Sequence, residues 1–184
     1  MRHLIRGGVA IAFVLYPFLV GYSLSQGHFI WISCLLIGLG VIRLLNKNNP
    51  LLWPLAGFSI LCGGLSVLLK DQAWLKMYPV LMSVGALIIF ASTLIKPPSM
   101  IERFARMADK DLPETAVQWT RNVTKVWCVF FALNAMAALY TVWSGRLQWW
   151  VWYNGFISYL LMGLLLVGEY LLRKVHQKRN LLSK

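Results

Sequence analysis

The most prominent feature of the chain is a set of five long stretches that contain no Asp, Glu, Lys or Arg. They cover residues 7–42, 48–69, 77–95, 126–145 and 147–168. A helix needs about 20 apolar residues to cross the roughly 30 Å hydrocarbon core of a bilayer, and every stretch reaches about that length. The pattern therefore predicts an all-α, polytopic membrane protein.

The first stretch is too long for one span, and its only polar break is "SLSQGH" at residues 23–28. Folding the chain into a hairpin there gives six transmembrane helices in a single bundle that covers residues 1–184. A cytoplasmic insert at 96–123 separates the fourth span from the fifth. The six predicted spans are residues 7–24, 29–45, 51–69, 78–95, 124–144 and 149–171.

The charges then predict how this bundle is oriented. The net charge is +12, although only 13% of the residues are charged. With both termini in the cytoplasm, the outside loops hold only Lys70, Lys76 and Arg146 among the basic residues. Cytoplasmic loops of membrane proteins carry an excess of Lys and Arg. The basic excess thus indicates topology and contact with anionic lipid, and it does not indicate a nucleic-acid partner.

The insert begins with a short amphipathic helix at "MIERFARMA", residues 100–108. Ser99 and Glu102 have the spacing of a capping box, in which the Ser hydroxyl accepts from the third helical amide and the Glu reaches back. Asp111 is expected to cap the next helix, with Pro113 in its first turn. The predicted apolar side holds Met100, Ile101, Phe104, Met107 and Ala108, and the polar side holds Glu102, Arg103 and Arg106.

Four basic residues of this region are candidates for docking a protein partner or binding lipid headgroups. They are Arg103, Arg106, Arg121 and Lys125. We expect the short helix to lie on the inner leaflet, where its arginines would meet anionic headgroups. Arg121 and Lys125 would lie where the fifth span enters the membrane. The sequence gives no oligomeric state.

Asp109 and Asp111 raise the alternative of a membrane transferase, because Asp-x-Asp can hold a divalent metal. A solvated helix break is favoured, since a metal site needs more oxygen ligands than two carboxylates supply. No catalytic residue, metal site or cofactor is therefore predicted, and the protein is more consistent with a non-enzyme.

A few polar residues within the spans form a second set of candidates, because ionisable groups inside a membrane are functional hypotheses by default. Glu169 lies near the cytoplasmic end of the last span, and Arg173 is placed four residues later for a helical ion pair. A proton or headgroup site there is the sharper alternative. Asn134 and Asn154 are expected to hydrogen-bond between helices.

Tryptophans gather near the ends of the predicted spans, as in the interfacial belt of membrane proteins. We therefore expect a belt rather than an aromatic ligand cage in "QWWVWYNG". The belt residues would be Trp31, Trp53, Trp74, Trp127, Trp143, Trp149, Trp150 and Trp152.

The second half of the chain resembles known families through "PPSMIERF", "DLPETAVQWTRNVTKVWCVFFALNAMAALYTVW" and "WWVWYNGFISYLLMGLLLVGEYLLR". It looks like a family of small uncharacterised bacterial inner-membrane proteins that are encoded among aryl-polyene, fatty-acid-like biosynthesis genes. More distantly, residues 60–174 are similar to the intracellular septation protein A (YciB/IspZ) family. The matching positions are Pro98, Arg103, Leu112, Pro113, Trp119, Asn122, Trp127, Phe130, Phe131, Asn134, Gly168, Tyr170 and Arg173.

These resemblances imply a bacterial inner-membrane protein that acts through partners in envelope biogenesis or serves a polyene-lipid pathway. Neither family brings a catalytic residue. The leading hypothesis is a non-enzymatic accessory or scaffold protein. The alternatives are a small carrier or flippase for a lipid-linked product, with a path lined by Glu169, Arg173, Asn134 and Asn154, and the transferase.

Overall fold

The chain is seen in a computed structural model that describes residues 17–27, 29–45, 53–108 and 112–182. Every regular element in these ranges is helical. Residues 17–25 form the first described helix. The elements that follow it are α2 (Phe29–Leu45), α3 (Trp53–Leu69), α4 (Ala73–Ile95), α5 (Met100–Ala108), α6 (Glu114–Trp143), α7 (Leu147–Trp152), the π-helical turn η2 (Tyr153–Ile157) and α8 (Ser158–Leu182).

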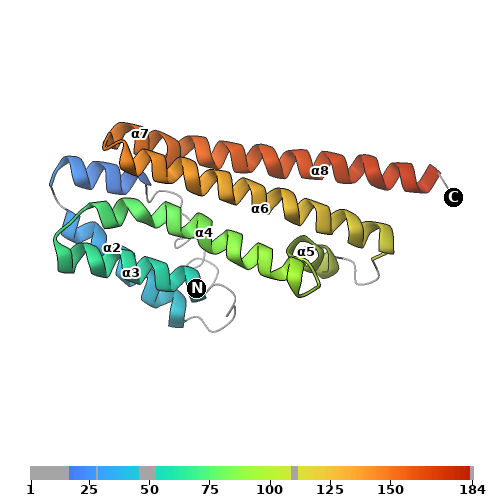
Figure 1. Cartoon of the computed structure of the whole chain (residues 1–184), viewed down its shortest axis with the longest axis horizontal. Helices are drawn as coiled ribbons and strands as arrows, with labels where there is room; N and C mark the ends of the chain where they lie inside the picture. The colour runs from blue at the N-terminus through green and yellow to red at the C-terminus, as the bar shows by residue number, and fades with distance from the viewer. Residues whose placement is uncertain (1–16, 28, 46–52, 109–111, 183–184) are drawn as a thin grey trace, which may run out of the picture.

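Long helices determine the shape of the molecule (Figure 1). α4, α6 and the continuous run of α7, η2 and α8 lie along the same axis, while α2 and α3 form a hairpin beside the first part of α4. The short α5 and the start of α6 lie at one end, and the turns that lead into α4 and α7 lie at the other. For brevity we call these the α5 end and the α7 end.

Three of the helical segments are long and apolar enough to cross a membrane: Ala73–Ile95, Glu114–Trp143 and Leu147–Lys174. α2 and α3 have 17 residues each, which is about 26 Å at 1.5 Å per residue and slightly less than a bilayer core. Membrane crossing by α2, α3 and the helix at 17–25 therefore stays a prediction. Most of the expected first span lies outside the described residues.

The breaks between helices differ in part from those expected. The fourth span was expected to begin at residue 78, but α4 already begins at Ala73. The Asp71 carboxylate accepts a hydrogen bond from Ala73 N–H at 2.8 Å, which satisfies a donor that the helix start would leave free. α6 begins at Glu114 with Pro113 in the capping position, so the helix starts later than a cap at Asp111 would place it.

The α7 end contains the largest apolar cluster of the described residues. It combines side chains from the helix at 17–25, α2, α3, α4 and α7: Val20, Leu24, Ile32, Leu36, Cys62, Leu75, Tyr78 and Trp150. A Cβ on Gly155 would lie 2.9 Å from the Phe18 ring. The absence of a side chain there lets the first helix approach η2 closely.

Two tryptophans were placed incorrectly in the expected interfacial belt. Trp150 is 0% exposed and donates from Nε1 to the Lys76 carbonyl at 3.0 Å. Trp127 is 5% exposed and packs among phenylalanines. Both rings are core residues because an indole N–H that finds a hydrogen-bond acceptor can be buried without a large cost.

Candidate functional site

α5 is fixed to the bundle by hydroxyl groups of the two helices on which it packs. Met100 N–H donates to Thr93 Oγ1 of α4 at 2.9 Å, and Ile101 N–H donates to Thr124 Oγ1 of α6 at 3.3 Å. The first amides of a helix have no partner within the helix. Neighbouring helices supply those partners here, so α5 is positioned by directional bonds at its N-terminus.

The Glu102 side chain is the buried charge of this region. The residue is 5% exposed. One carboxylate oxygen accepts from Ser99 N–H at 3.2 Å, and the other pairs with Arg106 at 2.8 Å. Both oxygens of the carboxylate are therefore compensated, as a buried charge requires. The expected capping box is half present, because Ser99 Oγ is buried without a hydrogen-bond partner among the described residues.

The faces of α5 differ from the expected ones at Glu102, which was expected on the polar side but points into the protein and is 5% exposed. On the predicted apolar side, Ile101 lies in the aromatic cluster of α4 and α6. Phe104 and Met107, on a helix expected to lie on the inner leaflet, are 46% and 76% exposed. Hydrophobic periodicity places a helix face toward apolar surroundings, but here a capping carboxylate competes for the inner position. The location of α5 at a membrane surface stays a prediction.

A groove of about 480 Å³ lies beside the start of α5. Arg106 and Arg121 both line it, and Arg121 also donates to the Leu94 carbonyl at 3.3 Å. Arg103 donates to the Pro98 carbonyl at 3.0 Å and is exposed. Lys125 lies outside the lining and donates to Asn122 at 3.4 Å. The structure thus brings together two of the four predicted docking residues.

Glu169 and Arg173 form the predicted ion pair, with 2.8 Å between Oε1 and the guanidinium. The carboxylate also accepts from Trp127 Nε1 at 3.3 Å, and the guanidinium lies 5.5 Å from the centre of the Trp119 ring. These contacts join α8 to α6. The partner role of Trp127 was not predicted, since a distance of 42 residues in sequence leaves no local pattern.

Asn134 and Asn154 connect helices in the middle of the protein. Asn134 donates to Ser83 Oγ of α4 at 2.9 Å and accepts from Tyr153 OH at 3.0 Å. Asn154 donates to Thr141 Oγ1 of α6 at 3.2 Å. Both asparagines line one pocket, whose lining includes neither Glu169 nor Arg173. Asp109 and Asp111 lie outside the described residues.

The fold and these sites define a class, which is a helical membrane protein with a short helix, α5, fixed against two long helices. The comparison with protein families is more specific. Residues 1–179 match the family model described as intracellular septation protein A, and the chain belongs to this family. This match is wider than the expected 60–174, because it also covers the N-terminal part of the chain.

Two curated relatives share the family. One is an inner membrane-spanning protein YciB of Nitrosomonas eutropha, 29% identical over 142 residues, which are 72% of this chain and 75% of the relative. The other is the inner membrane-spanning protein YciB of Hydrogenovibrio crunogenus, 27% identical over 117 residues, 62% of this chain and 53% of the relative. No solved structure matches the chain. Together with the three long apolar helices, the family makes this an inner-membrane protein with transmembrane helices.

Proposed function

We propose that the protein is a non-enzymatic accessory or scaffold protein of the inner membrane that serves cell-envelope biogenesis. Its insert at 96–123 would dock cytosolic proteins or anionic headgroups. The observation that carries the proposal is the groove beside α5, because two guanidinium groups, Arg106 and Arg121, line it together. Guanidinium groups bind carboxylate and phosphate through paired hydrogen bonds.

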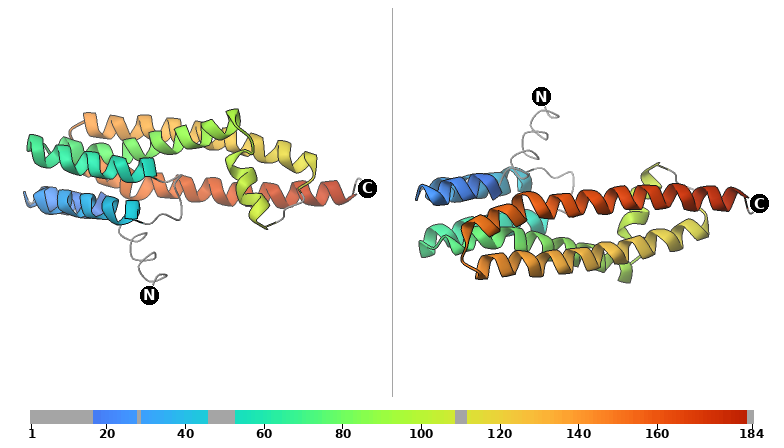
Figure 2. Two further views of the ribbon diagram at one scale, coloured as in Figure 1. Left: turned by 90° about the horizontal axis from the view of Figure 1, so that it is seen from below. Right: turned by 90° about the horizontal axis from the view of Figure 1, so that it is seen from above.

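The proposal includes six spans in one bundle with both termini in the cytoplasm. Two features support this orientation. Among the basic residues in the described part of the chain, only Lys70, Lys76 and Arg146 lie at the α7 end, and the positive-inside rule expects few basic residues on the outer side. In addition, α2 and α3 run beside only part of α4 and stop short of α5 (Figure 2). If α2 and α3 cross the bilayer, α5 lies at or beyond its inner surface.

The pathway served is a finer proposal, and it rests on the resemblance to proteins encoded among aryl-polyene genes. A bacterium that makes such a pigment would lose membrane-attached polyene when this gene is deleted. Normal pigment together with an envelope defect would assign the protein to envelope biogenesis in general.

Complementation tests the docking surface. The gene is deleted in its own bacterium, and cell length and sensitivity to detergent are measured after return of variant genes. We expect the double variant Arg103→Gln, Arg121→Gln to lose most of the rescue. Arg106 is left unchanged because it compensates the buried Glu102, and its removal would disturb the fold as well as the surface.

The matched control also removes two positive charges, but from the α7 end of the molecule. Lys70→Gln with Arg146→Gln should rescue fully, since both side chains are exposed in turns of the α7 end. Membrane levels of all variants are compared by immunoblot. Full rescue by the Arg103 and Arg121 double variant at equal level would refute the docking surface.

A carrier is the second candidate, and the pocket that contains Asn134 and Asn154 favours it. Glu169→Gln would then stop product movement across the membrane. Under the scaffold proposal the same variant keeps function, because the neutral amide still accepts from Trp127.

The transferase alternative requires loss of turnover in the double variant Asp109→Asn, Asp111→Asn. The scaffold and carrier hypotheses both expect this variant to be active.

A further inference from the structure

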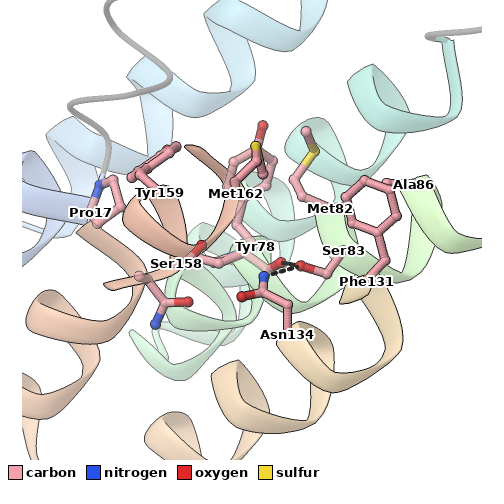
Figure 3. A pocket seen from close by; sticks show the side chains of 12 residues that line it. Pro17, Tyr78, Met82, Ser83, Ala86, Phe131, Asn134, Ser158, Tyr159 and Met162 are labelled. Atoms are coloured by element: carbon pink, nitrogen blue, oxygen red, sulfur yellow. Dashed lines mark hydrogen bonds between the residues drawn. The ribbon is translucent and has the colours of Figure 1, made fainter. Parts of the chain in front are cut away.

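The pocket in the middle of the bundle combines an apolar wall with a few polar atoms. It lies between α4, α6 and the junction of η2 with α8, and its volume is about 210 Å³. In Figure 3, Met82, Phe131 and Met162 surround the space near the Asn134 to Ser83 hydrogen bond. A ligand site is commonly built in this way, from apolar walls and a small number of placed polar groups.

The chemistry of the lining excludes a charged ligand group. Among the described residues that line the pocket, none carries a carboxylate, ammonium, guanidinium or imidazole group. A charge placed there would lose its hydration without an ionic partner, which is strongly unfavourable within a membrane. An occupant is therefore uncharged where it touches these walls.

Asn154 supplies a defined hydrogen-bond acceptor. The residue is 4% exposed. It donates both amide hydrogens, one to Thr141 Oγ1 at 3.2 Å and one to the Trp150 carbonyl at 2.9 Å. These two bonds fix the orientation of the amide and leave Oδ1 without a donor from the described part of the chain. An amide oxygen accepts up to two hydrogen bonds, so this atom requires a donor from a ligand or from water.

Asn134 supplies a donor in the same lining. Its Oδ1 accepts from Tyr153 OH, and one Nδ2 hydrogen goes to Ser83 Oγ. Ser83 donates onward to the Pro79 carbonyl at 3.0 Å, which fixes the hydroxyl as an acceptor toward Asn134. One Nδ2 hydrogen of Asn134 is left over. The two asparagines thus offer one acceptor and one donor, beside the hydroxyl groups of Tyr78, Ser158 and Tyr159 in the same lining. A hydroxyl group is both a donor and an acceptor.

We propose that this pocket binds the hydroxyl end of an uncharged lipid alcohol, with Asn154 Oδ1 accepting the hydroxyl hydrogen. The volume is smaller than the roughly 300–1,000 Å³ of sites that enclose a whole drug-sized ligand. It therefore takes the hydroxyl and the first part of the chain, and the rest of the lipid lies in the bilayer. The adjoining π-helical turn, η2, is a feature that often occurs at functional sites.

Photolabelling of the full-length protein in phosphatidylcholine nanodiscs tests the proposal. The probe is a long-chain primary alcohol with a diazirine close to the hydroxyl, and labelled peptides are identified by mass spectrometry. We expect saturable labelling of peptides that contain Tyr78–Ala86 or Asn154–Met162. The unlabelled alcohol should compete about fivefold better than its methyl ether, which has no hydrogen to donate to Asn154.

Two leucine variants of the same helix distinguish the pocket from the surrounding lipid. Ser158→Leu fills the pocket, and it should abolish saturable labelling. Gly163→Leu adds similar bulk on α8 where no atom lies within 4 Å of an added Cβ, and it should label like the unsubstituted protein. Thermal unfolding in detergent shows whether both variants fold.

Equal competition by the alcohol and its methyl ether would overturn the proposal, as would labelling that does not saturate. The competition experiment uses the unsubstituted protein, so it decides the question even if Ser158→Leu does not fold. The pocket and the α5 groove share no lining residue, and the complementation test above gives its answer independently of this one.

Discussion

The two ends of the molecule are held together by different kinds of contact (Figure 1). At the α7 end, apolar side chains from five segments close around Trp150, which is 0% exposed. At the α5 end, the contacts that fix α5 include a buried carboxylate, Glu102, and two threonine hydroxyls, Thr93 and Thr124. Packing dominates at the α7 end, whereas at the α5 end directional bonds add to the packing of Met100 and Ile101.

The difference shows how each end specifies its structure. Apolar packing tolerates exchanges that keep volume and shape, whereas a buried polar group whose partner is removed is left with an uncompensated desolvation cost. Loss of volume should therefore be most harmful at the α7 end. At the α5 end, loss of single atoms should be harmful even where the volume is kept.

The largest effect is expected for Trp150→Ala. This change creates a cavity in the apolar cluster and leaves the Lys76 carbonyl without its indole donor, so the free energy of unfolding should fall by about 4 kcal/mol. Unfolding in mixed detergent, followed by circular dichroism, measures it. The neighbouring Trp149 is 60% exposed, and Trp149→Ala should change little; equal losses in both variants would contradict the core role of Trp150.

Glu102→Ala tests the polar end. It leaves Ser99 N–H and Arg106 without the carboxylate that both now contact. Since the Arg106 side chain is 41% exposed, water replaces part of the ion pair, and we expect a loss of about 2 kcal/mol. Hydrogen exchange should increase first in α5. Glu114→Ala, at an exposed position, is the control and should leave exchange in α5 unchanged.

Thr124→Val removes a hydroxyl at nearly constant volume. The Ile101 amide would then be buried without an acceptor, which costs about 1.5 kcal/mol. Exchange of the first amides of α5 is the measurement. Thr115→Val makes the same change at an exposed position of α6. A similar effect from this control would mean that any loss of a threonine hydroxyl from α6, and not the hydrogen bond to Ile101, determines the result.

The sequence predicted the helical class of the fold because uncharged runs of membrane length are a property of local composition. The bounds of α2 coincide with the second expected segment, since "SLSQGH" and the charges after Ile42 delimit it on both sides. The start of α4 was missed because Asp71, a residue of the turn, satisfies the first amide of the helix. Such a contact depends on the conformation of the turn, which composition does not specify.

In the candidate site, the identity of a partner was predictable only where the two residues are close in sequence. Asn134 and Asn154 were expected to hydrogen-bond between helices and do so, but their partners were not named. Glu169 and Arg173, four residues apart, were recognised from their spacing. The groove that brings together Arg106 and Arg121 depends on how α5 packs against α6, and no local pattern contains this information. Trp127 was assigned to an interfacial belt because its partner is on another helix.

The smallest effect is expected where the two kinds of contact meet in one side chain. Trp127 packs among Phe90, Phe130 and Phe131 and also donates to Glu169. Trp127→Phe keeps an aromatic ring but removes the N–H, and we expect a loss of about 1 kcal/mol. Trp143→Phe, at a residue that is 86% exposed, is the matched control.

A double-mutant cycle isolates the hydrogen bond from the packing. Trp127→Phe and Glu169→Ala each remove one partner of the hydrogen bond, so their effects on the free energy of unfolding should not add. If the ring contributes through packing alone, the effects of the two changes will add within about 0.5 kcal/mol. That result would mean that Trp127 stabilises the protein by packing, as the apolar side chains of the α7 end do. The linkage of α8 to α6 at this residue would then depend on the aromatic cluster alone.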